Sequence, residues 1–249
     1  MISTPFEYTR ATSLDDALAK LGAANGDGKL IAGGHSLVPL MKLRLSEPKV
    51  LIDIARIPGM SGVGVKDGMI DIRAGTVHHD VATSDLLQRT CPVVAETAAD
   101  IGDPQVRNRG TIGGSLAHAD PAADYPAVML ALDAEIHVKG PGGWRLVKAP
   151  DFFQAMFTVD LAANEIIAGV QFKPIKSAAY AKLYQRDAAI EMRKRVVGIQ
   201  TDGLVESPLS ELVLLLLHHH QPEHMIYDIL PVVYLARALK LFERLVVFA

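Results

Sequence analysis

The stretch KLIAGGHSLVPLM (residues 29–41) indicates how this chain folds. An apolar run leads into two glycines, and Ser36 then precedes apolar residues at helical spacing. This order predicts a short strand, a tight turn and a helix that Ser36 caps. Glycines let a backbone approach an anion closely, and the N–H groups at a helix start can bind that anion. A phosphate-binding segment is one interpretation, and an ordinary tight turn is the other.

A second segment, GDPQVRNRGTIGGSLAHADPAAD (residues 102–124), again pairs two glycines with hydroxyls, at Thr111–Ser115. It is too polar and glycine-rich for a core element, so we expect a long functional loop. Two such segments suit a ligand with two phosphates and a long polar arm, although two unrelated turns explain the same letters. Neither segment is a GxGxxG or Walker motif, so the sequence supports neither a Rossmann nor a P-loop site.

Strand and helix signals alternate around these two segments. Before residue 57, strands are predicted at residues 6–10, 29–32 and 50–54, with a helix at 14–21 that Ser13 caps. After a linker at residues 58–62, hairpins are predicted around Asp67–Gly68 and residues 140–143. A helix is predicted over residues 76–87, capped by Thr76, and a further strand at 165–172. Strand and helix signals therefore occur on both sides of the linker.

The composition excludes several classes of function. The chain has 249 residues, 49% of them hydrophobic, and a formal net charge of -3, which fits a globular protein and disfavours a nucleic-acid binder. Cys91 is the single cysteine, so this chain can form neither an internal disulfide nor a cysteine-ligated cluster. No apolar run approaches the ~20 residues of a membrane-spanning helix, and residues 1–10 show no secretory signal. We expect a cytoplasmic protein.

Several polar side chains are candidates for binding. His118, Asp120 and Asp124 could hold zinc or calcium, bind ligand hydroxyls, or simply face solvent. No fourth ligand stands at a sensible spacing, so we predict no metal site. His78 and His79 begin a helix beside an aspartate and are expected at the surface.

Residues 32–57 and 102–136 together resemble the FAD-binding medium subunit of molybdenum hydroxylases, in particular that of aerobic carbon monoxide dehydrogenase within the wider xanthine dehydrogenase family. The resemblance covers residues 1–185, and residues 190–249 depart from the family pattern. It implies an FAD-binding domain of the vanillyl-alcohol-oxidase or PCMH type, with α+β subdomains at residues 1–57 and 58–175. FAD would lie between them. A small sheet-and-helix domain, atypical or truncated, would occupy residues 176–249.

The resemblance also implies a role for individual residues. The first pyrophosphate segment corresponds to Ala32, Gly33, Gly34, His35 and Ser36, and the second to Thr111, Ile112, Gly113, Gly114 and Ser115. Asp124 corresponds to a carboxylate that binds the ribitol hydroxyls, with His118 and Asp120 beside the same arm. Ile167 corresponds to an apolar residue near the flavin or adenine. Lys182 corresponds to a lysine near the flavin pyrimidine, where a cation favours negative charge on reduced flavin. No catalytic residue is implied.

The implied function is electron transfer within an oxidoreductase complex. A large subunit would oxidise substrate at molybdenum, and a small subunit would relay electrons through two [2Fe–2S] clusters to FAD on this chain. Quinone, NAD or oxygen would accept them, in a dimer of heterotrimers that is cytoplasmic or peripheral to the inner face of the membrane through its partners. The alternatives are a stand-alone flavin oxidase with FAD linked to His35, and a non-catalytic assembly protein.

Overall fold

A computed structural model gives the fold and describes residues 3–180, 182 and 197–198. The chain divides into two compact units, residues 1–200 and 201–249, and every described residue belongs to the first. The C-terminal domain predicted for residues 176–249 therefore lies almost entirely outside the described residues. Among the helices that are described, none has the length and apolar character needed to span a bilayer.

The N-terminal part forms a small parallel sheet in the order β1-β3-β2. β1 (Glu7–Arg10), β3 (Val50–Asp53) and β2 (Gly28–Ile31) run in register, so that Ile31 and Arg10 both pair with Asp53. Helix α1 (Leu14–Ala23) follows β1, and the Ser13 hydroxyl caps it by accepting a hydrogen bond from the Asp16 N–H at 3.0 Å. Helix α2 (Leu37–Lys42) follows β2.

The second sheet has five strands in the order β4-β5-β10-β6-β7, and all the strand pairs are antiparallel. β4 (Val63–Lys66) and β5 (Met69–Arg73) form the predicted hairpin, and β6 (Glu135–Gly140) pairs with β7 (Gly143–Lys148). β10 (Ile166–Phe172) lies between the two hairpins. The positive φ angles of Asp67 (52°) and Gly68 (76°) match a type I′ turn, as the Asp-Gly pair predicts.

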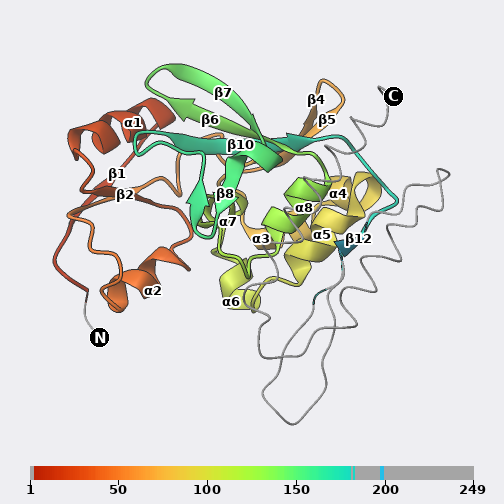
Figure 1. The fold of residues 1–249 in the computed structure, drawn as a ribbon, viewed down its shortest axis with the longest axis horizontal. Helices are drawn as coiled ribbons and strands as arrows, with labels where there is room; N and C mark the ends of the chain where they lie inside the picture. The colour runs from red at the N-terminus through yellow and green to blue at the C-terminus, as the bar shows by residue number, and fades with distance from the viewer. Residues whose placement is uncertain (1–2, 181, 183–196, 199–249) are drawn as a thin grey trace, which may run out of the picture. The chain divides into compact units, whose positions relative to one another are not determined.

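Helices fill the long connection between β5 and β6 and lie below the sheet in Figure 1. They are α3 (His78–Ala82), α4 (Asp85–Thr90), α5 (Pro92–Ala99), α6 (Pro104–Arg107), α7 (Ile112–His118) and α8 (Tyr125–Ala131). Short elements complete the described part: α9 (Ala149–Phe152), the β8 (Phe153–Ala155) and β9 (Thr158–Val159) hairpin, and β11 (Ala179–Tyr180) paired with β12 (Val197–Gly198).

The core lies between this sheet and its helices. One row of paired residues crosses three strands, with Ile72 of β5, Val170 of β10 and Ile136 of β6 all fully buried. Leu87 of α4 and Met129 of α8 are also fully buried in the same cluster. Burial alternates along β6, whereas β10 is buried along almost its whole length, and the helices cover the apolar face of the sheet (Figure 1).

Three local predictions were wrong. The helix expected over residues 76–87 is split into α3 and α4, because the Ser84 hydroxyl starts a new helix by capping the Leu87 N–H. Thr76 caps neither helix: its hydroxyl donates to the Arg73 carbonyl and accepts from the Gly62 N–H. The loop expected over residues 102–124 contains α6 and α7, and α7 buries Ile112 and Leu116 in the core.

The α+β class is confirmed, and helix α1 contacts the second sheet through side chains. Lys139 of β6 forms an ion pair with Asp15 of α1 at 2.5 Å. The same ammonium group lies 5.3 Å from the ring centre of Trp144 on β7. The boundaries proposed at residues 57 and 175 stay a prediction, although each sheet falls within one predicted subdomain.

Removing side-chain volume from the row of paired core residues tests this packing. Ile72→Ala is expected to lower the free energy of unfolding by about 2–5 kcal/mol, because a buried cavity replaces lost apolar contacts. Val65→Ala on the neighbouring strand is the control, since Val65 is 60% exposed, and it should cost about 1 kcal/mol or less. Urea denaturation measures both, and equal losses would contradict this assignment of the core.

Candidate functional site

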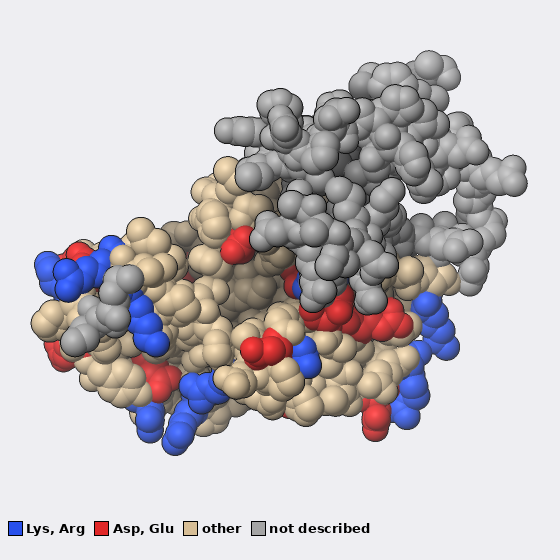
Figure 2. Space-filling view, turned by 90° about the horizontal axis from the view of Figure 1, so that it is seen from below, with Lys and Arg blue, Asp and Glu red and all other residues tan. Residues whose placement is uncertain are grey.

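The first glycine segment, residues 32–36, leaves the carboxyl edge of the parallel sheet. Because all three strands are parallel, the segments after β1, β2 and β3 meet at this one edge, where ligands of such sheets commonly bind. Gly34 has a φ of +77°, which favours glycine, and His35 and Ser36 are exposed. In Figure 1 the helices α2 and α6 lie at the lower edge, and Figure 2 views that side, where a hollow lies in a mostly uncharged surface.

The two glycine segments touch each other directly. A Cβ atom placed on Gly33 would lie 2.8 Å from the carbonyl carbon of Arg109 and 2.8 Å from the Cα of Gly110. Only glycine fits at position 33 without moving the backbone of the other segment. The structure thus brings together the residues that the sequence placed in two separate candidate segments.

The first segment presents a row of backbone donors. Within the described part of the chain, the N–H groups of residues 33–37 donate to no acceptor. The prediction that Ser36 caps α2 was wrong, because its side chain makes no capping hydrogen bond and its backbone is helical. Successive N–H groups in such a turn form a concavity that suits an anion.

The second segment differs, because its N–H groups are already used. The Ile112 N–H donates to the Thr76 carbonyl at 3.0 Å, and the Gly113 N–H to the Ala74 carbonyl at 2.8 Å. The Thr111 hydroxyl caps α7 by accepting from the Gly114 N–H at 3.1 Å, and the Thr111 carbonyl accepts from Ser115. The two segments therefore have similar letters but offer a ligand different groups.

The glycines of the second segment fit against neighbouring side chains. A Cβ on Gly113 would lie 2.5 Å from the Cβ of Ala74 at the end of β5. A Cβ on Gly110 would lie 2.6 Å from Nε2 of the His78 ring. The backbone N–H of His78 donates to the Gly110 carbonyl at 2.9 Å. These close contacts fix the second segment onto the sheet and onto the start of α3.

His78 is buried, which contradicts the expectation of a surface position, whereas His79 is exposed as expected. Burial lowers the pKa of His78 to about 4, the negative charge of Asp124 raises it in part, and His35 lowers it further. The imidazole is therefore neutral at pH 7. The contact of His78 with Gly110, which in turn meets Gly33, places both candidate segments near it. The burial of His78 was missed because His79 and Asp80 directly follow it and indicate a surface position.

Asp124 lies at the start of α8 and is buried beside the side chains of Tyr180 and Lys182. It accepts a hydrogen bond from the Tyr180 hydroxyl and forms an ion pair with Lys182 at 3.0 Å. The Lys182 ammonium also donates to the Asp100 carbonyl at 2.9 Å. Two predicted site residues 58 positions apart, Asp124 and Lys182, are thus in direct contact.

The remaining predicted residues lie on either side of this group. His118 ends α7 and packs its ring 5.2 Å from that of Phe157, while Asp120 accepts from the Ala122 N–H. Within the described residues these two and Asp124 do not gather into a metal-binding cluster. Ile167 is buried on β10, opposite Val138, where a bulge follows it.

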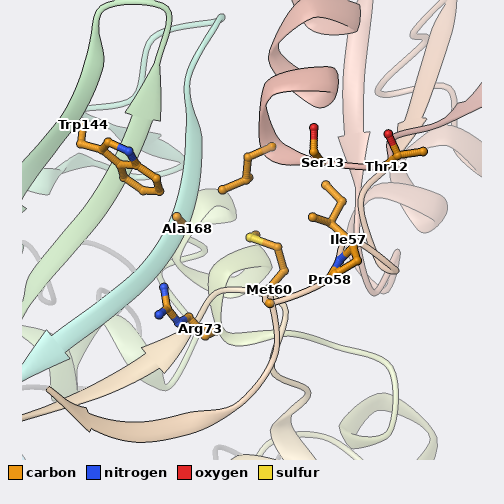
Figure 3. Close-up of a pocket in the computed structure, with 10 residues that line it drawn as sticks. Thr12, Ser13, Ile57, Pro58, Met60, Arg73, Trp144 and Ala168 are labelled. Atoms are coloured by element: carbon orange, nitrogen blue, oxygen red, sulfur yellow. The ribbon is translucent and has the colours of Figure 1, made fainter.

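A cavity of about 240 Å³ lies elsewhere, and Figure 3 shows it. Ser13 and Met60 line one side, and Arg73, Ala168 and Trp144 of the second sheet line the other. None of residues 32–36 or 111–115 contributes to its lining. The cavity is therefore separate from the contact between the glycine segments, and it contains none of the predicted site residues.

Comparison with known proteins identifies the family. The FAD binding domain in molybdopterin dehydrogenase matches residues 4–172, more than half of the chain. The carbon monoxide dehydrogenase medium chain of Hydrogenophaga pseudoflava is 41% identical over 204 residues, covering 78% of this chain and 71% of its own length. The 6-hydroxypseudooxynicotine dehydrogenase complex subunit alpha of Paenarthrobacter nicotinovorans is 39% identical over 203 residues, covering 80% and 69%.

Solved structures agree with this match. The carbon monoxide dehydrogenase of Hydrogenophaga pseudoflava that lacks the Mo-pyranopterin moiety superposes with a TM-score of 0.73 and 43% identity. The match covers 75% of this chain and 66% of that chain, so the present sequence spans about two thirds of its length. The fold at residues 4–172 is a flavin-binding domain associated with molybdenum enzymes. This chain belongs to the family of FAD-binding domains in molybdopterin dehydrogenases.

Family membership confirms the main prediction of the sequence. The chain is an FAD-binding oxidoreductase subunit of the molybdenum-hydroxylase type, and carbon monoxide dehydrogenase medium chains are among its relatives. The relatives are named as subunits or medium chains, which implies partner subunits and supports this prediction over a stand-alone flavin oxidase.

The contact at Gly33 yields a test by substitution. Gly33→Ala is expected to lower the free energy of unfolding by about 1–3 kcal/mol, because its Cβ would overlap a backbone that cannot move aside cheaply. Gly22→Ala is the control, since a Cβ there meets nothing within 4 Å and alanine favours the helix, so it should stabilise by about 0.5–1 kcal/mol. Thermal or urea unfolding measures both, and a neutral Gly33→Ala would refute the close contact.

The depressed pKa of His78 predicts a dependence of stability on pH. The native state resists protonating this imidazole, so the stability it contributes is present above pH 6.5 and is lost as pH falls toward about 4. Between pH 7 and pH 5 the native chain should lose about 1–2 kcal/mol more unfolding free energy than His78→Gln. Urea titrations at the two pH values measure this difference, and parallel losses would contradict the buried neutral state.

Proposed function

We propose that this chain binds FAD non-covalently between residues 1–57 and 58–175, and passes electrons from partner [2Fe–2S] clusters to an acceptor. The observation that carries the proposal is the direct contact of the glycine segments at Gly33 and Gly110, in a chain of this family. A long cofactor that bridges two subdomains needs binding groups from both. The segment contact supplies them side by side.

The first segment is proposed to provide most of the hydrogen bonds to the diphosphate. The N–H groups of residues 33–37 have no acceptor within the described residues, and phosphate oxygens are strong acceptors. The Ala32 to Ser36 backbone would therefore surround the anion, with Gly34 setting the turn. The residues present fit the cofactor at this point.

The second segment is proposed as a wall beside the diphosphate. The N–H groups of Ile112, Gly113, Gly114 and Ser115 are bonded within the fold, so they have less to donate to an anion. Gly114 is exposed and has no side chain, which lets a ligand approach the helix closely. The Thr111 hydroxyl holds the start of α7 in place.

The acidic end of the site is proposed to hold the sugar and flavin parts. Asp124 would accept from ribitol hydroxyls, and Lys182 would place its positive charge near the flavin pyrimidine. Their mutual ion pair of 3.0 Å orients both groups before the cofactor arrives. His118 and Asp120 would lie along the same arm, and Ile167 would offer an apolar contact.

Electron transfer is the chemistry that FAD supplies when bound, and the protein positions the cofactor and adjusts the local charge. Lys182 would favour negative charge at the reduced flavin, and the neutral His78 adds no competing cation. Cys91 is the only cysteine of the sequence and is buried, so this sequence cannot ligate the clusters, which the proposal places on a partner subunit. We assign no catalytic residue to this chain.

Carbon monoxide is the proposed substrate of the complete enzyme, oxidised at molybdenum in a large partner subunit. The identity of 41% to a carbon monoxide dehydrogenase medium chain supports this choice, although other relatives are named for nicotine-derived substrates. The proposed assembly is a dimer of heterotrimers that also contains a small [2Fe–2S] subunit. Quinone, NAD or oxygen is the proposed acceptor, and the complex would lie in the cytoplasm or at the inner face of the membrane.

Isolation of the complex from its native cells tests this function. A tagged chain should copurify with a molybdenum-containing large subunit and a small iron–sulfur subunit, and carbon monoxide should bleach the flavin absorption of the complex. Bleaching by a different substrate, with the same partners, would overturn only the substrate. A chain that purifies alone with FAD and oxidises a substrate by itself would overturn the subunit assignment.

A pair of glycine substitutions tests the role of the first segment. Gly34 and Gly59 share a φ of +77°, so alanine introduces the same backbone strain of roughly 1–2 kcal/mol at both positions. Gly34→Ala should weaken FAD binding at least about tenfold because it disturbs the N–H row. Gly59→Ala should change the dissociation constant less than about twofold, and fluorescence titration with FAD measures both. Equal changes in the dissociation constant for FAD would contradict diphosphate binding by the first segment.

A further inference from the structure

Two polar groups are buried without partners behind the second glycine segment. Nδ1 of His78 and the hydroxyl of Tyr125 each lack a hydrogen-bond partner among the described residues. His78 is 4% exposed and Tyr125 is fully buried. Unpaired buried polar groups cost free energy and commonly mark a site where an ordered water completes the bonding.

The two groups belong to one cluster. Their ring centres lie 5.4 Å apart with the planes inclined at 54°, and the negative charge of Asp124 acts on both. Burial, followed by the charge of Asp124, raises the pKa of Tyr125, so its hydroxyl keeps its proton at neutral pH and can donate. His78 is neutral, so one of its ring nitrogens can accept.

The cluster also supports the cofactor site from behind. Nε2 of His78 packs so closely against Gly110 that a Cβ atom on Gly110 would not fit. Gly110, together with Arg109, also contacts Gly33 of the first segment. Tyr125 directly follows Asp124 at the start of α8. The imidazole and the phenol thus link the two glycine segments to the carboxylate proposed for the ribitol.

We propose that an ordered water molecule bridges Nδ1 of His78 and the hydroxyl of Tyr125, and that these two side chains are positioning residues for the FAD site. A water needs two or more polar partners, and these two unpaired groups provide them. The imidazole then holds the backbone of Gly110 in position against Gly33, and the water bridge holds Asp124 in position at the start of α8. The cofactor part of this inference rests on the proposed function.

Unfolding without FAD tests the bridge by itself. Tyr125→Phe keeps the ring and removes the hydroxyl, so the melting temperature should fall by about 2–4 °C if the hydroxyl is bridged. An unchanged or higher melting temperature would overturn the bridge, because removing a truly unpaired buried hydroxyl relieves a penalty. Tyr8→Phe is the matched control, since the Tyr8 side chain is 52% exposed and its hydroxyl donates to Asp53.

A double-mutant cycle tests whether the two residues share one bridge. His78→Leu removes both nitrogens, and the double variant with Tyr125→Phe should melt no lower than the less stable single variant. If the falls in melting temperature of the two single variants add fully in the double variant, the two residues do not share one water. His78→Asn is the rescue variant, because its amide group occupies the place of Nδ1 and can bond the same water.

Titration with FAD tests the positioning role. Tyr125→Phe and His78→Leu should each weaken FAD binding about tenfold, whereas His78→Asn and Tyr8→Phe should stay within about threefold of the native chain. If Tyr125→Phe and His78→Leu both bind FAD with native affinity, the positioning role is overturned and the water bridge is unaffected. A native chain that binds no FAD would instead refute the proposed function, and the melting data would still decide the bridge.

Discussion

The close approach of two backbone segments is the constraint on which the site depends. Gly33 meets Arg109 and Gly110 with no room for a Cβ, although more than 70 residues separate them in the chain. The first segment follows β2 of the parallel sheet, and the second lies in the helical connection between β5 and β6 of the other sheet. The strand pairings of each sheet position one segment, and the glycines allow the segments to meet. Packing, rather than a chain of catalytic side chains, is what the sequence has to specify here.

From that contact the other site residues follow in order. Gly110 rests on His78, His78 packs beside Tyr125, and Asp124 next to it pairs with Lys182. Each step joins a segment that the chain order separates, so the site forms only when the helices between β5 and β6 are in place. This arrangement fits an electron-transfer subunit, whose role is to hold and tune a cofactor.

Much of the fold could be predicted from local patterns. The Asp67–Gly68 turn, the Ser13 cap and the strand signals at residues 50–54 and 165–172 are local, and the structure agrees with them. The helix α7 was missed because glycines and hydroxyls hide its apolar face, which consists of Ile112 and Leu116 alone. The break between α3 and α4 was missed because one serine cap outweighs a continuous helical pattern.

The site was only partly predictable. The motif letters located both glycine segments, yet they could not show that one segment leaves its N–H groups unpaired while the other uses them internally, because the partners Ala74 and Thr76 are distant in sequence. The burial of His78 and the pairing of Asp124 with Lys182 likewise arise from tertiary contacts.

The visible absorption spectrum of the purified chain, before and after acid precipitation, tests most directly the claim that this chain binds FAD non-covalently. The account predicts flavin absorption near ~450 nm and release of intact FAD into the supernatant. A protein without flavin that takes up none on reconstitution, or flavin that stays with the precipitate, would contradict it.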